Sequence, residues 1–146
     1  MTTTPSSSME TMPLRLQDYQ EFVQQVTSKE SNSMEAFLNR IRSLDDQDQA
    51  QIPLLMTSAI GLSSETGEFN EIVKKILFQG KPLTDDNVFH MKRELGDILW
   101  YWINACRALK LDPNDVVREN MEKLKARYPG LAFNADRSEN RKAGDL

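Results

Sequence analysis

Four acidic residues form two pairs with the same spacing: Glu65 with Glu68, and Glu94 with Asp97. Residues three apart on a helix lie on one face, so each pair would project two carboxylates in one direction. The chain between the pairs is long enough for a loop and a return, so an antiparallel hairpin would bring them face to face. Crowded carboxylates repel one another at low dielectric, and a divalent cation removes that conflict.

Oxygen ligands of this kind suit Mg²⁺ or Mn²⁺ better than zinc. A bound Mg²⁺ keeps coordination positions for water and for phosphate oxygens, which the hydrolysis of a phosphoanhydride requires. Three further polar side chains follow the acids at helical spacing and would lie beside them on the same faces: Lys75, Tyr101 and Asn104. The pattern therefore predicts a metal site with polar neighbours that can contact a substrate.

A solvated helix face and a di-iron centre are the two alternatives to this metal site. A single acidic pair usually belongs to a solvated face, but two pairs on successive helices, each within an apolar run, favour an inward-facing site. Gly67 and Gly96 lie inside the two motifs, and a glycine within a helix costs roughly 0.5–1 kcal/mol relative to alanine. Close approach of the helices would account for them. A di-iron bundle needs Glu-x-x-His motifs, and His90 is the only histidine.

The elements that would position these residues are helices. Apolar residues recur at helical spacing, Pro53 fits a first helical turn, and Asp112-Pro113 is a typical helix start. The expected helices cover 14–26, the region of 34–41, 53–78, 88–110 and 113 to about 128. No strand pattern is present, so we expect an all-α fold in the form of a small bundle.

The length of 146 residues fits one domain. We expect a disordered N-terminal tail over 1–13, a helical domain over 14–130 and a polar C-terminal tail over 131–146. One cysteine excludes a disulfide framework within the chain, and the net charge of −4 gives no indication of a nucleic-acid partner. No apolar run is long enough for a membrane span and no signal pattern is present, so we expect a cytoplasmic protein.

Three segments carry a resemblance to a known family: ETGE at 65–68, ELGD at 94–97 followed by ILWYW, and NMEKLKARYP at 120–129. They resemble the small, single-domain bacterial and phage members of the MazG-like all-α nucleotide pyrophosphohydrolases. The resemblance implies a four-helix-bundle core that associates as a homodimer or homotetramer. It also implies Mg²⁺-dependent cleavage of a nucleoside triphosphate between the α and β phosphates.

The resemblance also implies roles for individual residues. Metal ligands would be Glu65, Glu68, Glu94 and Asp97, and Glu65 or Glu68 would act on the attacking water. By this resemblance, substrate contacts would come from Tyr101, Asn120 and Lys123. Lys75 and Asn104 join them by their helical spacing, and a tail arginine, either Arg137 or Arg141, would stabilise the leaving pyrophosphate.

Two alternatives remain open at the level of sequence. One is a pyrophosphatase with narrow specificity for dUTP or dCTP, although some dCTP-preferring relatives place tryptophan at the position of Lys75. The other is a helical interaction module without enzymatic activity. We expect the chain to act in the cytoplasm of a bacterium or of a phage-infected host.

Overall fold

The computed structural model describes residues 15–130 and 132–140, apart from the side chain of Arg137, and within these ranges every regular element is a helix. The prediction of an all-α fold is confirmed. The segment 1–13, expected to be disordered, and Arg141 lie outside the described residues. Contacts within the chain divide it into two compact units, Met1–Arg42 and Ser43–Leu146. None of the described helices is both long and apolar enough to cross a membrane.

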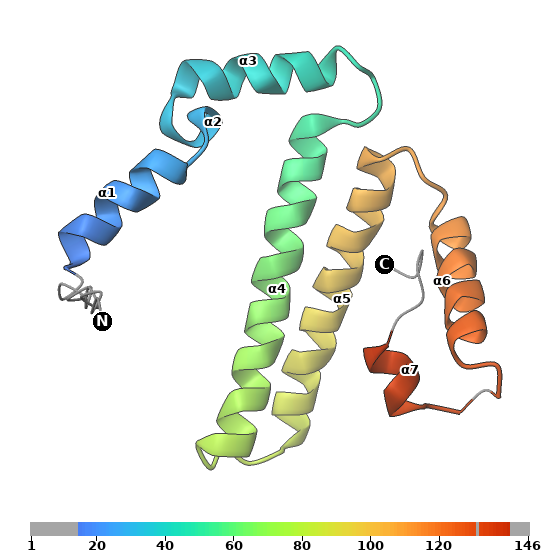
Figure 1. Ribbon diagram of the computed structural model, residues 1–146. Coiled ribbons are helices and arrows are strands. Elements are labelled where there is room, and N and C mark those ends of the chain that lie inside the picture. Colours follow the sequence, from blue (N-terminus) through green and yellow to red (C-terminus); the bar gives the residue numbers. More distant parts are fainter. Residues whose placement is uncertain (1–14, 131, 141–146) are drawn as a thin grey trace, which may run out of the picture. The chain divides into compact units, whose positions relative to one another are not determined.

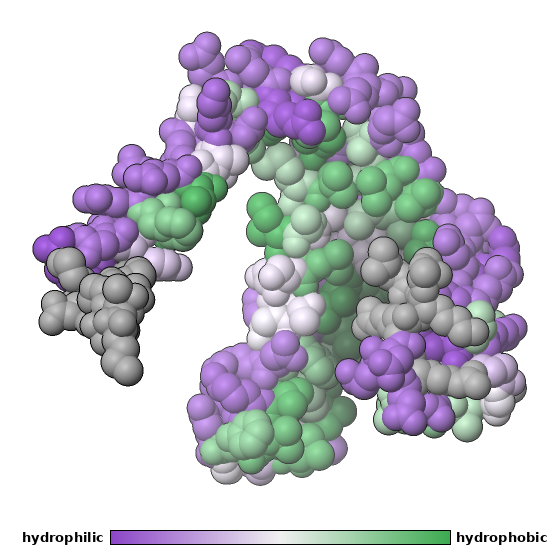
Figure 2. All heavy atoms as spheres, viewed as in Figure 1, coloured by the Kyte–Doolittle hydropathy of each residue, from purple (hydrophilic) through white to green (hydrophobic). Residues whose placement is uncertain are grey.

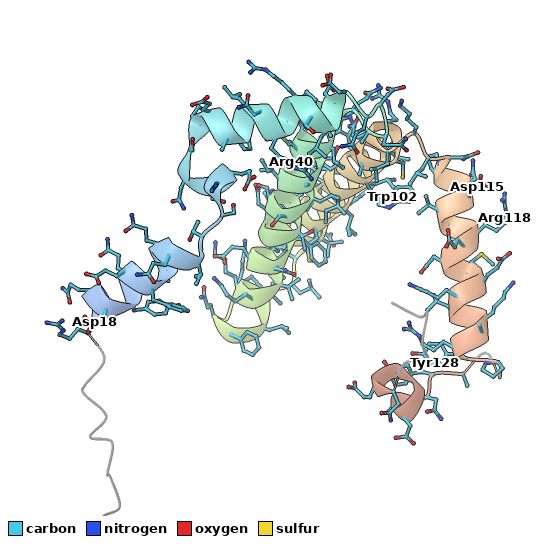
Figure 3. All side chains as sticks on the ribbon, turned by 45° about the horizontal axis from the view of Figure 1, so that its top comes forward. Asp18, Arg40, Trp102, Asp115, Arg118 and Tyr128 are labelled. Atoms are coloured by element: carbon cyan, nitrogen blue, oxygen red, sulfur yellow. The ribbon has the colours of Figure 1, made fainter. Side chains whose placement is uncertain are left out.

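The first unit contains α1 (Leu16–Val26), α2 (Lys29–Asn32) and most of α3 (Met34–Asp45). An ion pair between Arg15 and Asp18, 2.8 Å long, lies at the beginning of α1, where Asp18 is labelled in Figure 3. The short α2 lies between the helices expected over 14–26 and in the region of 34–41, where no helix was predicted. It forms because the Ser28 hydroxyl accepts a hydrogen bond from the backbone N–H of Ser31.

In the second unit, α4 (Ile52–Phe78) and α5 (Asp85–Ala108) pack side by side and run antiparallel (Figure 1). The long helix expected from Pro53 to Phe78 is confirmed, with Pro53 in its first turn. Gly80, at a φ of 69°, follows the end of α4. The second long helix begins at Asp85, earlier than predicted, because the Thr84 hydroxyl accepts a hydrogen bond from the N–H of Asn87 at 3.3 Å.

The open end of the hairpin is tied by contacts between the α3–α4 connection and the end of α5. The backbone N–H of Gln51 donates to the carbonyl of Ala108 at 2.8 Å. The Lys110 ammonium donates to the backbone oxygen of Asp48 and pairs with its carboxylate at 2.6 Å. Asp48 and Lys110 both have positive φ, 51° and 57°, which L residues rarely adopt. The start of α4 is therefore held beside the end of α5.

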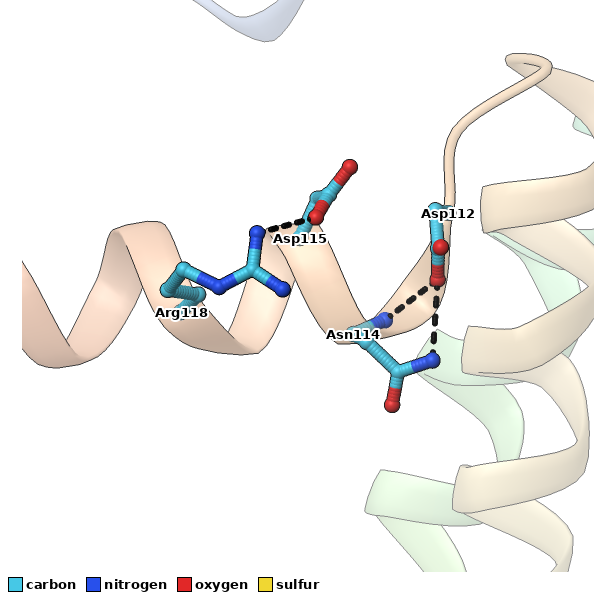
Figure 4. A network of polar contacts seen from close by, with 4 residues as sticks. All are labelled: Asp112, Asn114, Asp115 and Arg118. Atoms are coloured by element: carbon cyan, nitrogen blue, oxygen red, sulfur yellow. Dashed lines mark hydrogen bonds and ion pairs between the residues drawn. The ribbon is translucent and has the colours of Figure 1, made fainter.

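After the hairpin come α6 (Pro113–Arg127) and the short α7 (Ala135–Glu139). Asp112 caps α6 as predicted, because its carboxylate accepts hydrogen bonds from the backbone N–H and the side-chain amide of Asn114 at 2.8 and 3.0 Å (Figure 4). An ion pair between Asp115 and Arg118 follows one turn later. The helix α7 lies in the segment that the sequence predicted as a polar tail.

The second unit buries few apolar side chains. Among the described residues, the buried apolar ones are Ile52, Cys106 and Ala108. Large apolar side chains on α5 remain more than half exposed, and Figure 2 shows hydrophobic residues over the surface of the hairpin. An apolar helix face must be covered by another element to contribute stability. Among the described residues, the helices that pack extensively against each other are α4 and α5. A second chain could cover their exposed apolar faces, and dimerisation stays a prediction.

The cap at Thr84 can be tested directly. Thr84→Ala should lower the free energy of unfolding by about 1 kcal/mol, because the N–H of Asn87 loses its acceptor. Thr84→Ser retains a hydroxyl and should be close to the wild type. Urea unfolding followed by circular dichroism measures both variants, and equal stability of Thr84→Ala and Thr84→Ser would contradict the role of the cap.

Candidate metal centre

Carboxylates from both long helices meet in the middle of the hairpin. Glu65 and Glu68 on α4 and Glu94 on α5 each offer an oxygen, and these oxygens all lie within 4.8 Å of one another. Glu65 and Glu94 are partly buried, whereas Glu68 is exposed. The hairpin thus brings together three of the four acids that the sequence singled out.

The fourth acid belongs to the same electrostatic group. The pKa of Glu65 is raised above its ordinary value, first by burial and then by the negative charges of Glu68, Asp97 and Glu94, with a hydrogen bond that protonated Glu65 donates to Glu94 as a further cause. Among the described residues, the groups that shift this pKa are all carboxylates. Uncompensated carboxylates with hard oxygen donors fit a divalent cation such as Mg²⁺ or Mn²⁺.

A close contact between α4 and α5 lies one turn from the carboxylates. Gly61 is buried, and a methyl group added there would overlap three ring carbons of Tyr101. The ring of Tyr101 also meets that of Trp100 edge-on, with centroids 4.7 Å apart. Tyr101, which the sequence placed beside the acids as a substrate contact, therefore lies against α4.

Sequence reasoning missed Gly61 and assigned the close approach to the wrong glycines. Among the described residues, nothing lies within 4 Å of a methyl group built at Gly67 or at Gly96, so close helix approach does not account for either one within this hairpin. A signal was nevertheless present in the sequence. Gly61 lies four residues before Glu65, and Tyr101 lies four residues after Asp97, so the two occupy mirrored positions on antiparallel helices.

Two of the predicted substrate residues have partners in their own helices. Lys75 pairs with Glu71 at 3.2 Å, and Glu71 also pairs with Lys74. Asn104 is buried, and its amide donates to the carbonyl of Trp100 at 3.1 Å while its oxygen accepts a hydrogen bond from Arg107 at 2.8 Å. Both side chains therefore have partners within their own helices, and their binding of substrate stays a prediction.

The remaining predicted contacts lie on later segments. Asn120 and Lys123 are exposed on α6. Arg141 and the side chain of Arg137 lie outside the described part of the chain. The roles of all four residues stay predictions.

Comparison with known proteins agrees with the arrangement of the helices and acids. Residues 56–132, from within α4 to beyond α6, match the MazG nucleotide pyrophosphohydrolase domain. The chain therefore belongs to this family of hydrolases, as the resemblance indicated.

One curated relative is the Gene 37 protein of Mycobacterium phage L5, which is 35% identical over 69 residues. The match covers 47% of this chain and 60% of the phage protein, which is less than two thirds of its length. No solved structure gives a significant match.

The raised pKa of Glu65 predicts how the metal-free protein responds to pH. A group whose pKa is higher in the folded state stabilises the fold at low pH, and this contribution is lost as pH rises through the folded-state pKa. Glu65→Gln removes the charge, and its amide can still donate a hydrogen bond to Glu94. The variant should be more stable than the wild type at neutral pH and lose this advantage toward about pH 4, the ordinary range for a glutamate.

Urea unfolding of both proteins in metal-free buffer across this pH range measures the difference. Asp18, whose pKa Arg15 lowers, and Glu71, whose pKa Lys74 and then Lys75 lower, act in the opposite direction. Both are present in the two proteins, so their effect cancels in the comparison. A stability difference that does not change with pH would show that repulsion at Glu65 is not what the substitution relieves.

Proposed function

We propose that this chain is a nucleoside triphosphate pyrophosphohydrolase that depends on Mg²⁺ and produces a nucleoside or deoxynucleoside monophosphate and pyrophosphate. The observation that carries the proposal is the meeting of acidic side chains from α4 and α5 inside the region that matches the family. Carboxylates repel a triphosphate, so binding of substrate at this cluster requires a cation between them. A cytoplasmic location, where triphosphates are made and used, belongs to the same proposal.

In this proposal Glu65, Glu68, Glu94 and Asp97 would hold Mg²⁺, with Mn²⁺ as a substitute, because both ions prefer oxygen ligands. The bound cation would offset the negative charge on the triphosphate oxygens. Glu68 and Asp97 are exposed, so the cluster is open to solvent and a phosphate chain can reach it from their side. Glu65 and Glu94, which are partly buried, would hold the cation together with them.

Glu65 or Glu68 would orient the attacking water and accept its proton. The water oxygen forms a bond to the α phosphorus, the bond from that phosphorus to the bridging oxygen breaks, and this oxygen leaves with pyrophosphate. Both carboxylates belong to the cluster that would hold the cation, so either one would be close to a water bound there.

The proposed cationic contacts to the phosphates are Lys75, Lys123 and Arg141. Lys75 can exchange its ion pair for a phosphate without stranding Glu71, because Lys74 also pairs with that carboxylate. Positive side chains near the departing pyrophosphate would stabilise its charge. Further contacts to the substrate are proposed for Tyr101, Asn104 and Asn120.

A narrower specificity for dUTP or dCTP is a finer version of the same proposal. Membership of a hydrolase family supports an enzyme over a helical interaction module without activity. A panel of triphosphates with detection of pyrophosphate and of the monophosphate separates a broad enzyme from a narrow one, and an interaction module would release neither product.

Association of chains is also part of the proposal. Leu95, Leu99 and Trp100 on α5 are 54%, 56% and 57% exposed, and in a homodimer or homotetramer a second copy would cover such side chains. Burial of apolar surface contributes about 25 cal/mol per Å², so covering them would add substantially to stability.

Replacing one carboxylate of the cluster by its amide should impair turnover without affecting the fold. Glu68→Gln and Asp97→Asn should each lower the rate of pyrophosphate release by at least about a hundredfold, because an electrostatic contact to the reacting phosphate is lost. Both changes are isosteric, so the circular dichroism spectrum and the molecular mass in solution should match the wild type. Full turnover by both variants would contradict the metal centre.

Charge placed on the apolar side of α5 tests association. Leu95→Asp combined with Leu99→Asp should reduce the mass measured by light scattering during size-exclusion chromatography, because buried unpaired charges are costly. Arg93→Asp adds a comparable charge on another side of α5 and serves as the matched control. A wild-type chain that is monomeric, or a mass unaffected by the double substitution, would contradict an interface at these leucines.

A further inference from the structure

We propose that the ring of Tyr101, seated on Gly61, sets the register between α4 and α5 and so positions the four carboxylates for one cation. This inference rests on the proposed metal centre, and it assigns Gly61 as a positioning residue. The evidence is the close contact itself: Gly61 is buried, and a side chain as small as a methyl group there would overlap the Tyr101 ring.

The register follows from the geometry of antiparallel helices, whose residues advance by equal steps in opposite directions. Gly61 lies level with Tyr101. Four residues later on α4 and four residues earlier on α5, Glu65 lies level with Asp97. Three more residues place Glu68 level with Glu94. The grouping of Glu65, Glu68 and Glu94 within 4.8 Å, and the action of the Asp97 charge on Glu65, agree with this register.

Toward the start of α4, the same register pairs small or polar residues along the line of contact between α4 and α5, here called the seam. Ser58 is level with Asn104, and both are buried. Ala108 is fully buried one turn further along α5. The Ser58 hydroxyl donates to the carbonyl of Leu54 at 2.7 Å, within its own helix. Because small residues interlock weakly, the bulky ring of Tyr101 packed on Gly61 resists sliding in the middle of this contact, between the restraints at the two ends of the hairpin.

A slip of the helices would separate the carboxylates. The next residue on the same face of a helix is three or four positions away, and a helix rises about 1.5 Å per residue. A slip to that position would displace one acidic pair by about 4.5–6 Å relative to the other. That displacement is as large as the 4.8 Å that encloses the three carboxylate oxygens. A cation bound by both helices would then lose the ligands of one of them.

The experiment measures Mn²⁺ affinity in the full chain by electron paramagnetic resonance, at a temperature at which circular dichroism shows each variant to be folded. Gly61→Ala should weaken Mn²⁺ binding by roughly ten- to a hundredfold, the usual cost of disturbing residues that orient metal ligands. Gly67→Ala and Gly96→Ala are the matched controls, because a methyl group at either position meets open space. Both should retain wild-type affinity.

A double variant that adds a methyl group at Gly61 and removes the ring of Tyr101 tests whether Mn²⁺ affinity can be restored. In Gly61→Ala combined with Tyr101→Ala, the new methyl group enters space that the ring has left, so Mn²⁺ affinity should recover relative to Gly61→Ala alone. A non-additive result of this kind marks a direct interaction. Tyr101→Phe keeps the ring and should retain affinity, whereas Tyr101→Ala alone should weaken it. The two Tyr101 variants decide the question if Gly61→Ala does not fold.

The outcomes separate the register from the function. Wild-type affinity in Gly61→Ala, or equal affinities in Tyr101→Phe and Tyr101→Ala, would overturn the positioning role and leave the proposed enzyme intact. A wild-type chain that neither binds Mn²⁺ nor releases pyrophosphate would overturn the proposed function. The contact would then be judged by thermal unfolding alone, where a Gly61→Ala variant as stable as Gly67→Ala would overturn it.

Discussion

The carboxylates of Glu65, Glu68 and Glu94 repel one another at the distances that α4 and α5 impose, and the hairpin must hold them together against this repulsion. Local features at each end supply the restraint. The Thr84 cap lies where the chain turns, and the hydrogen bond from Gln51 to the carbonyl of Ala108 lies at the other end. Burial of part of the cluster strengthens the repulsion and makes any cation that relieves it more effective.

The residues between α4 and α5 allow the helices to approach closely but bury little hydrophobic surface. Ser58, Gly61 and Ala108 are all buried and small, so the helix axes can come close enough for carboxylates to converge. Little apolar surface is removed from water in this way, and the large apolar residues of α5 remain on its other faces. The small residues between α4 and α5 therefore have two effects: they let the carboxylates converge, and they leave the large apolar side chains exposed.

The sequence was sufficient to predict the helical class, both long helices, the Asp112 cap and the meeting of the acidic pairs. These features depend on residue type and spacing within one helix, which periodicity reports directly. Residues 85–87 of α5 and the short α2 were missed because the turns that follow the hydroxyl caps at Thr84 and Ser28 lie outside the apolar pattern. The close approach was placed at Gly67 and Gly96 because periodicity identifies a face of a helix but not what lies opposite a given residue. The partners of Lys75 and Asn104 were likewise unreadable, since each depends on a rotamer chosen among several neighbours.

The turn that joins α4 to α5 also bears on how the second unit folds. Only residues 79–84 separate the two helices, so the first contacts between them close a short loop at low entropic cost. Contacts far from the turn close longer loops, and pairing should therefore proceed from the turn toward Gln51 and Ala108. Glu68 and Glu94 are nearer to the turn than Gly61 and Tyr101, so the acids come together before the ring reaches its notch. In the proposed metal centre, a divalent cation present during folding would therefore act on the rate of closing the hairpin as well as on its stability.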